Sequence, residues 1–253
     1  MKVLSIDLDY IMKPSIEIFN SVFFDDNPTL RWENLFNNVD FKESHFYIDQ
    51  SNLLFCFNTF LKALKNCNNV SFGYDHDSIL FSIAEYEDIE IINIDHHDDV
   101  FGGDYANQSP LEDALKQEYY EILKHNRIHE GNWAAWLSGK EKLKSFTWIG
   151  NENSGNKSRN FYNSEIIPNY KNVEKENYKF DHYNFDHIFI CLSPQYIPKN
   201  HWHYFSMFIT AFEEFTGKSA IIYTQKFETS IRHQLIHNEI LHQCSNGRGS
   251  LLG

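Results

Sequence analysis

The residues of this chain best suited to chemistry are five consecutive ionisable side chains, Asp95-His96-His97-Asp98-Asp99. They directly follow the apolar run of residues 91–94, which predicts a buried strand. Because side chains of an extended strand alternate between its two faces, Asp95, His97 and Asp99 would project to one side. Two carboxylates and an imidazole make an oxygen and nitrogen ligand set, which suits Mn²⁺, Fe²⁺ or Zn²⁺. The alternative is a solvated, acidic strand end.

Two further places in the sequence combine a strand end with metal-ligating side chains. Asp7 and Asp9 close the strand-like residues 3–9 and would share one of its faces, the alternative again being a solvated strand end. His76 follows another strand-like run, where it is either a ligand or merely the start of a helix. Because ligand sites of parallel α/β folds lie at the carboxyl ends of the strands, we expect these places to meet.

Together the three strand ends offer four carboxylates and two imidazoles, enough for two divalent ions with bridging carboxylates. A pair of ions about 3.5–4 Å apart generates a hydroxide at neutral pH and stabilises developing negative charge. The residue types therefore predict metal-dependent hydrolysis as the reaction class.

The elements that position these residues are predicted from hydrophobic patterning. Strand-like runs occur at residues 3–9, 70–74, 89–95, 146–149, 187–192 and 220–223, and several of them are continuous apolar runs, typical of strands covered on both faces. Helices are predicted at residues 51–64, with Ser51 as the N-cap, and at 111–124, 204–215 and 230–242. The alternation predicts one α/β domain over residues 1–253, a mostly parallel sheet flanked by helices on both faces. The polar residues 151–183 are predicted to form a long loop within it.

Composition and charge restrict the class of protein and its partners. The 253 residues include 22 Phe and 14 Tyr, enough apolar material for a substantial core. The net charge of -13 opposes binding to nucleic acid and favours a cationic substrate or bound divalent metals. No apolar window is long enough for a membrane helix, and the start has no signal-peptide pattern. With four widely spaced cysteines, these features predict a cytoplasmic protein with reduced thiols.

The three ligand-bearing segments resemble those of the arginase–agmatinase superfamily. Tyr74-Asp75-His76 resembles its Gly-Gly-Asp-His element, and residues 95–99 resemble its Asp-x-His-x-Asp element. Residues 5–9 resemble its Ser-Phe-Asp-x-Asp element, but they open the chain, whereas that element comes last in ordinary arginases. With residues 130–133 and 191–198, this order is similar to a divergent group that includes peptide arginases. The resemblance implies an arginase-like three-layer sandwich with a rearranged or circularly permuted strand order.

The resemblance also implies a ligand set, a reaction and a partner. It implies two Mn²⁺ ions, with Fe²⁺ or Co²⁺ as alternatives, held by His76, Asp7, Asp95 and Asp99 and by His97, Asp7, Asp9 and Asp95. A metal-bridging hydroxide would cleave the guanidinium C–N bond of arginine side chains in a ribosomally made precursor peptide, giving ornithine and urea. His97 and Asp99 are accordingly predicted to be catalytic residues as well as ligands.

Substrate recognition is predicted less directly, because the chain departs from the arginase pattern. Arginases have a histidine shortly after a Ser-Gly-Asn triplet, whereas here Gly131-Asn132 is followed by Trp133. Glu130 is the predicted catalytic and guanidinium-binding residue, since a carboxylate pairs with both arms of that group. A surface position before a turn is the alternative. Asn132 and Trp133 are the other predicted substrate-binding residues, and residues 151–183 could border a cleft for the peptide.

Three other functions remain open from the sequence. In a haloacid-dehalogenase-type phosphatase with Mg²⁺, Asp7 would be the nucleophile and Asp9 the general acid/base. Against it, Tyr10-Ile11 replaces the expected small hydroxyl and aliphatic pair, and residues 95–99 would have no role. A zinc deacetylase of the wider arginase-like fold would need only one metal ion. A peptide-binding scaffold could keep the fold and lose turnover.

Overall fold

The computed structural model describes residues 1–13, 28–37, 42–100, 128, 131–152, 154, 167–180 and 182–224. The predicted helices at residues 111–124 and 230–242 and the predicted site residue Glu130 lie outside the described residues. None of the helices within these ranges has the length and apolar content that a membrane crossing requires. Cys56, Cys67 and Cys191, the cysteines in this part of the chain, form no disulfide there.

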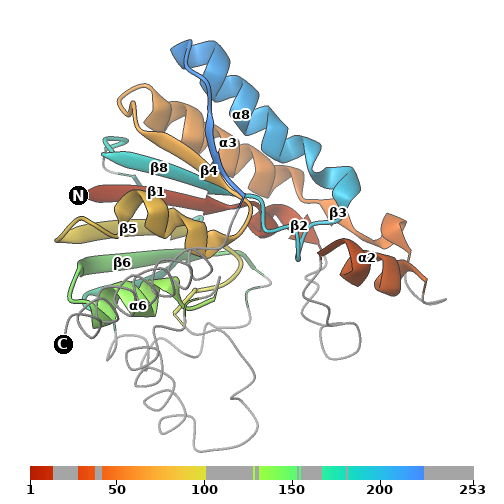
Figure 1. Cartoon of the computed structure of the whole chain (residues 1–253), viewed down its shortest axis with the longest axis horizontal. Coiled ribbons are helices and arrows are strands. Elements are labelled where there is room, and N and C mark those ends of the chain that lie inside the picture. The colour runs from red at the N-terminus through yellow and green to blue at the C-terminus, as the bar shows by residue number, and fades with distance from the viewer. Residues whose placement is uncertain are drawn as a thin grey trace, which may run out of the picture.

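A seven-stranded sheet forms the centre of the described structure (Figure 1). Its strands follow the order β7-β6-β5-β1-β8-β4-β9, and every neighbouring pair is parallel. In chain order they are β1 (Lys2–Asp7), β4 (Val70–Gly73), β5 (Ile89–Ile94), β6 (Leu143–Gly150), β7 (Tyr170–Glu174), β8 (His187–Cys191) and β9 (Ile221–Tyr223). All six predicted strands are confirmed. A separate antiparallel pair is formed by β2 (Met12–Lys13) and β3 (Tyr47–Ile48).

The first strand lies in the middle of the sheet, between β5 and β8. Val3 is paired with Ile91 on one side and with His187 on the other. Leu4 and Ile6 belong to one apolar core and Val3 to the other, so the strand is buried on both faces. This double burial is why its sequence is a continuous apolar run and not an alternating one.

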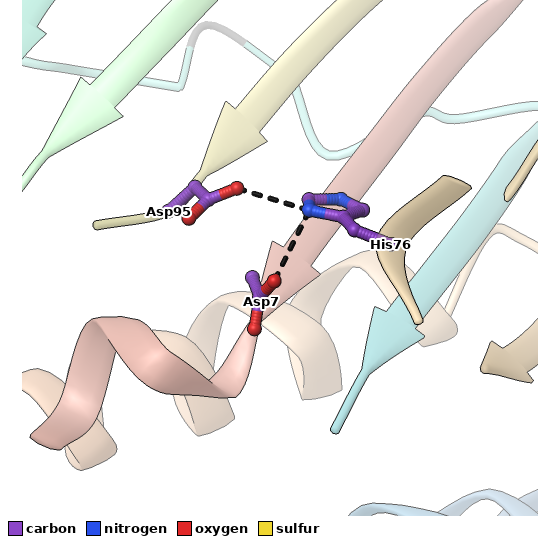
Figure 2. Close-up of side chains that lie close together, drawn as sticks. All are labelled: Asp7, His76 and Asp95. Carbon is purple, nitrogen blue, oxygen red and sulfur yellow. Dashed lines mark ion pairs between the residues drawn. The ribbon is translucent and has the colours of Figure 1, made fainter. Parts of the chain in front are cut away.

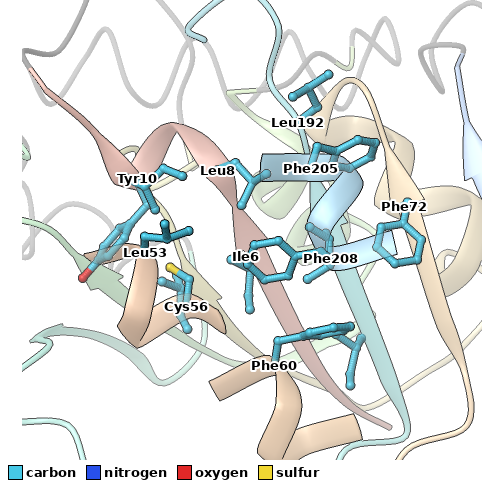
Figure 3. Packing of buried hydrophobic residues seen from close by; sticks show 14 of the residues in the cluster. Ile6, Leu8, Tyr10, Leu53, Cys56, Phe60, Phe72, Leu192, Phe205 and Phe208 are labelled. Carbon is cyan, nitrogen blue, oxygen red and sulfur yellow. The ribbon is translucent and has the colours of Figure 1, made fainter. Parts of the chain in front are cut away.

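Helices cover both faces of the sheet, as the sequence predicts. On one face, α3 (Gln50–Leu64) and α8 (His203–Thr216) lie side by side (Figure 1) and bury Phe60 and Phe208 (Figure 3). The second core, on the other face, includes residues of η4 (His76–Ile79), α4 (Leu80–Ile83) and α6 (Trp133–Gly139). The remaining described helices are α2 (Pro28–Phe36), η1 (Leu8–Ile11), η3 (Glu43–His45) and η7 (Lys199–His201).

The ends of the two long helices test the capping predictions. Asp49 caps α3, because its carboxylate accepts hydrogen bonds from the backbone N–H groups of Ser51 and Asn52 at 2.8 and 3.0 Å. The prediction of Ser51 as N-cap is therefore wrong, since an acceptor two residues earlier already satisfies these donors. The predicted end of α8 near Gly217 is confirmed: Gly217 has φ 67°, the left-handed conformation that favours glycine after a helix.

The prediction of one long loop over residues 151–183 is wrong in part. Tyr170–Glu174 forms β7, which pairs with β6 from Phe146 opposite Tyr170 to Gly150 opposite Glu174. β7 lies at one edge of the sheet, and none of its residues is fully buried. An edge strand needs few apolar side chains, so it lacked the pattern by which the buried strands were recognised.

Candidate metal centre

The candidate ligands lie at the carboxyl ends of neighbouring strands, where the chain leaves the sheet in two directions. α3 follows β1 and packs on one face of the sheet, whereas α6 follows β5 and packs on the other. A crevice between adjacent strands with opposite exits is where open α/β sheets bind ligands. Asp7 ends β1 and Asp95 directly follows β5, so both lie where these two exits diverge.

Asp7 and Asp9 do not share a strand face, contrary to the prediction. β1 ends at Asp7 and the 3-10 helix η1 begins at Leu8, so Asp9 lies on a turn. The Asp7 carboxylate caps this turn by accepting a hydrogen bond from the Asp9 backbone N–H at 3.1 Å. Capping by a short polar side chain competes with extension of the strand, which explains the difference. Both carboxylates nevertheless belong to the ligand groups of the centre.

Residues 95–99 likewise form a turn and not an extension of β5, which ends at Ile94. The Asp95 carboxylate accepts a hydrogen bond from the His97 backbone N–H at 2.9 Å. Asp99 has a positive φ of 52°, an uncommon conformation for a residue with a side chain. The predicted alternation of Asp95, His97 and Asp99 is therefore wrong in its geometry, although the turn brings all three residues to the centre.

The first ligand group surrounds the imidazole of His76. Its Nδ1 atom lies 3.1 Å from Asp7 Oδ2 and 3.0 Å from Asp95 Oδ2 (Figure 2). The Oδ2 atom of Asp99 is nearer still, at 2.7 Å. One ring nitrogen carries at most one proton, and this one has no hydrogen-bond partner of acceptable geometry among the described residues. Three carboxylate oxygens around one nitrogen are the arrangement that a shared cation would explain.

The second ligand group surrounds His97. Its Nδ1 atom lies 2.8 Å from Asp9 Oδ2 and 3.9 Å from Asp95 Oδ1. The ligand atoms of Asp9, Asp95 and His97 all lie within 4.8 Å of one another, as do those of Asp7, His76 and Asp95. Asp95 therefore offers one oxygen to each histidine and stands between the two groups. Asp7, the other bridging residue that the resemblance implies, is grouped only with His76.

The position of His76 depends on close packing across β8. Its ring stacks on Phe189 with the centroids 5.9 Å apart and an angle of 13°. Gly73, the last residue of β4, makes room for that phenylalanine, since an added Cβ atom would lie 2.6 Å from the Phe189 ring. A larger residue at position 73 would therefore displace the ring that supports the candidate ligand.

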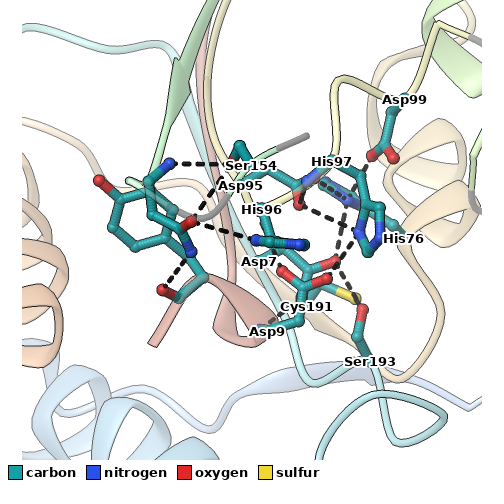
Figure 4. A network of polar contacts seen from close by, with 12 residues as sticks. Asp7, Asp9, His76, Asp95, His96, His97, Asp99, Ser154, Cys191 and Ser193 are labelled. Carbon is teal, nitrogen blue, oxygen red and sulfur yellow. Dashed lines mark hydrogen bonds and ion pairs between the residues drawn. The ribbon is translucent and has the colours of Figure 1, made fainter. Parts of the chain in front are cut away.

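The candidate ligands belong to a network of polar contacts (Figure 4). In addition, two polar residues inside the strands hold His76 and Asp95 in position. The Oγ atom of Ser5 lies 2.7 Å from His76 Nε2, which leaves Nδ1 to face the carboxylates. Asn93 Nδ2 donates to Asp95 Oδ2 at 3.1 Å. Neither residue was identified from the sequence, yet each stands in an apolar strand two positions before an aspartate. That spacing puts a polar side chain on the same strand face as the ligand, a signal that could have found both.

Two further residues reach the carboxylates from outside β1 and β5. Trp133 Nε1 donates to Asp99 Oδ2 at 2.6 Å. Ser193, just after β8, donates from Oγ to Asp7 Oδ2 at 2.5 Å and has a positive φ of 49°. Such hydrogen bonds orient metal-binding carboxylates and tune their affinity.

The centre concentrates negative charge away from water. Burial and then the charge of Asp9 raise the pKa of Asp7, and burial and then Asp95 raise that of Asp9. Burial, together with Asp99 and Asp7, raises the pKa of Asp95 to about 7. Burial lowers the pKa of His76, but Asp99 and the other carboxylates outweigh it and raise the pKa well above 6.5. A divalent cation would relieve this repulsion, because it favours the ionised carboxylates.

The predicted substrate-binding residues lie deeper than expected. Trp133 is fully buried, with its ring centroid 5.0 Å from that of His76, and Asn132 is buried at the start of α6. The contact of Trp133 with Asp99 makes it a support for a ligand. Substrate binding by Asn132 and Trp133 stays a prediction, as does the role of Glu130.

The accessible side of the centre is at His97, whose side chain is 20% exposed. The half-buried ring of Tyr196 lies 4.8 Å from the His97 ring between centroids. Next to it, Gln195 is buried and donates from Nε2 to Asp75 Oδ1 at 3.4 Å, while its Oε1 atom has no partner among the described residues. The loop after β8 therefore places an aromatic ring beside His97 and, at the neighbouring position, a buried acceptor without a partner among the described residues.

The donor set fits a hard or borderline divalent cation. Both groups consist of carboxylate oxygens and imidazole nitrogens, the ligands that Mn²⁺, Fe²⁺ and Zn²⁺ accept. The cluster thus meets the chemical requirement of the predicted metal centre, whereas the superfamily resemblance rests on the sequence motifs alone. No protein-family model, no curated protein and no solved structure matches this chain.

Proposed function

We propose that this protein is a hydrolase that binds two Mn²⁺ ions and cleaves guanidinium groups of arginine side chains in a peptide. One observation carries the proposal: the Asp95 carboxylate stands between two histidines, with Oδ2 at 3.0 Å from His76 and Oδ1 at 3.9 Å from His97. A carboxylate shared in this way suits two ions held close together. The ions would supply a hydroxide at neutral pH and stabilise negative charge at the reacting carbon.

The residues divide between the two ions by their distances. His76, Asp7 and Asp99 would hold the first ion with one oxygen of Asp95. His97 and Asp9 would hold the second with the other oxygen of Asp95. The buried Ser5 contacts Nε2 of His76 and so fixes the orientation of the ring, with Nδ1 toward the carboxylates.

A cationic peptide is the substrate that the rest of the molecule favours. The chain carries a net charge of -13, which attracts a guanidinium group and opposes an anionic substrate. Beside the accessible His97, the Tyr196 ring offers a face on which a guanidinium group can stack. Gln195 Oε1 can accept one guanidinium N–H, since it is buried and has no partner in the described part of the chain. Hydrolysis would give ornithine in the peptide and urea.

The direct test compares a short capped peptide containing one arginine with free arginine, using protein loaded with Mn²⁺. We expect urea and a peptidyl ornithine from the capped peptide, with little or no urea from the amino acid. The matched control is Asp95→Asn, which keeps the size of the side chain and removes its charge. Absence of urea from both substrates would reject the hydrolase. Hydrolysis of a phosphate monoester with Mg²⁺ would instead support the phosphatase alternative.

A further inference from the structure

A cavity of about 270 Å³ lies at the carboxyl ends of β6 and β7, separate from the candidate ligands. Its walls are Tyr10, residues 150–152 and residues 174–176. This volume is close to the lower limit of about 300 Å³ for small-molecule sites. It therefore suits one side chain or a small ion and not a folded partner.

Among the residues that line this cavity, Tyr10 has a buried polar atom without a hydrogen-bond partner in the described part of the chain. Its side chain is fully buried, and its hydroxyl has no hydrogen-bond partner among the residues that the structure describes. Figure 3 shows the hydroxyl pointing away from the apolar cluster around Leu53 and Cys56. A buried hydroxyl without a partner destabilises a fold, so a ligand atom in the cavity would satisfy a real deficit. Burial also raises the pKa of Tyr10, which keeps the phenol protonated and neutral.

The charges around the cavity select the ligand. Glu152, Glu174 and Glu176 line it, against one lysine, Lys175. The ammonium group of Lys175 is directed to α3, where it donates to Asn52 Oδ1 at 2.6 Å. Glu152 forms an ion pair with Lys13, and the Lys175 ammonium group also lies 3.8 Å from Glu176 Oε1. Glu174 and Glu176 are exposed. The lining is thus negative overall and favours a positively charged group with N–H donors.

The cavity lies one side chain away from the metal centre. Asn151 lines it and contacts His96 Nδ1 through Oδ1 at 3.2 Å. The same amide donates from Nδ2 to the Tyr10 carbonyl at 3.0 Å. The backbone N–H of His96 donates to Asp9 Oδ1 at 3.3 Å, and Asp9 is also the residue before Tyr10. The cavity and the metal centre are therefore neighbours in the fold.

We propose that this cavity binds the ammonium or guanidinium group of a second basic residue, close in sequence to the arginine that is hydrolysed. The cation would donate to the Tyr10 hydroxyl and pair with Glu174 and Glu176. The identity of the ligand as part of the substrate rests on the proposed function, whereas binding of a cation in the cavity does not. The proposed specificity is for arginine followed or preceded at short distance by another basic side chain.

The test measures binding and not turnover, by fluorescence anisotropy of labelled peptides on the Mn²⁺-loaded protein. A set of peptides carries one arginine and one lysine, one to four positions away on either side, and a matched set has norleucine in place of lysine. We expect at least one lysine peptide to bind about tenfold more tightly than its norleucine partner. Equal affinities throughout the set would overturn the proposal.

Two variants assign the effect to the cavity. Tyr10→Phe and the double variant Glu174→Gln, Glu176→Gln should each reduce the lysine preference to about twofold or less. The control Glu85→Gln, Glu214→Gln removes the same number of charges from exposed positions elsewhere. This control variant should retain the lysine preference of the wild type. A preference that persists in both cavity variants would contradict the proposal, as would a melting temperature of Tyr10→Phe well below the wild type without peptide. A lysine preference without urea release would reject the hydrolase and leave the cavity site standing.

Discussion

Two buried histidines at opposite ends of the same sheet show what distinguishes the candidate site from the rest of the core. His76 follows β4 and is 1% exposed, and His187 begins β8 and is 7% exposed. Each ring lies with Nε2 against a serine hydroxyl, Ser5 at 2.7 Å and Ser71 at 2.8 Å. Burial and a serine partner are therefore common to both histidines and cannot be what makes one of them functional.

The difference lies in the other groups around each ring. His76 Nδ1 faces three carboxylate oxygens, and these raise its pKa well above 6.5 despite burial. Ser71, the partner of His187, continues through Ser82 to Tyr223 in a chain of neutral hydroxyl groups, and burial lowers the pKa of His187 to about 4. The candidate metal centre is therefore distinguished by the carboxylates that surround its buried histidine, and not by the burial of that histidine.

The largest expected effect follows from removing the carboxylate shared by the two groups. Asp95→Asn keeps the shape of the side chain and removes its charge, so both ions lose a ligand. We expect metal affinity to fall by at least about a hundredfold, since even residues that only support ligands change it by about 10–100-fold. His187→Gln, at the other end of the sheet, should retain the wild-type metal content. Equal metal content in Asp95→Asn and wild type, measured by elemental analysis, would remove the distinction between the two regions.

The second effect concerns the dependence of folding stability on pH through His187, the histidine that burial keeps neutral. Its pKa is about 4 in the fold against 6.5 for an ordinary histidine, so the unfolded chain binds its proton first as pH falls. The stability that this difference contributes is complete above pH 6.5 and is lost as pH falls to about 4. The loss amounts to at most about 3.4 kcal/mol, at 1.36 kcal/mol for each of about 2.5 pKa units.

Urea unfolding of the metal-free protein at several pH values between 7 and 4 measures this loss. The matched variant His187→Gln lacks the titrating group, so its stability should depend less steeply on pH than that of the wild type. Because other carboxylates titrate in both proteins, the difference between the two curves is the quantity of interest. Parallel curves would show that His187 is not held neutral by burial.

A smaller effect separates the two serines. Ser5→Ala removes the partner of His76 Nε2, and we expect metal affinity to fall about 10–100-fold without loss of the fold. Ser71→Ala removes the corresponding partner of His187 and should leave metal affinity unchanged, with a loss of about 1 kcal/mol in unfolding free energy. Competition with a fluorescent chelator measures the first quantity. Equal metal affinities of the two variants would contradict the assignment of Ser5 as a positioning residue.

Much of the fold could be predicted from the sequence because strands that are buried on both faces consist of consecutive apolar residues. Several of the six predicted strands are continuous apolar runs, which can be recognised without knowing their neighbours. The exposed edge strand β9 was predicted as well, because Ile221, Ile222 and Tyr223 are apolar or β-forming residues. β7 was missed because its edge position leaves its residues exposed or half-buried, without an apolar run. The Ser51 prediction failed because Asp49, two residues earlier, is also a residue type that caps helices. Residue types alone cannot decide between neighbouring caps.

The candidate ligands could be identified from the sequence, but the geometry that brings them together could not. Alternation along a strand placed Asp7 with Asp9, whereas the structure uses a 3-10 turn to do so. Trp133 was predicted to bind substrate, and its contact with Asp99 depends on packing between α6 and the sheet, which no local pattern contains. Long-range contacts of this kind need the fold, whereas the residue types of a metal centre do not.

The central claim is that the carboxylates and histidines at the carboxyl ends of β1, β4 and β5 hold two metal ions. The most direct test is elemental analysis of protein produced with manganese and then desalted, beside the double variant His97→Ala, Asp99→Ala. We predict close to two transition-metal ions per chain in the wild type and a sharp fall in the variant, with both proteins folded by circular dichroism. A wild-type protein that retains no metal, or a variant that retains as much as the wild type, would contradict the account.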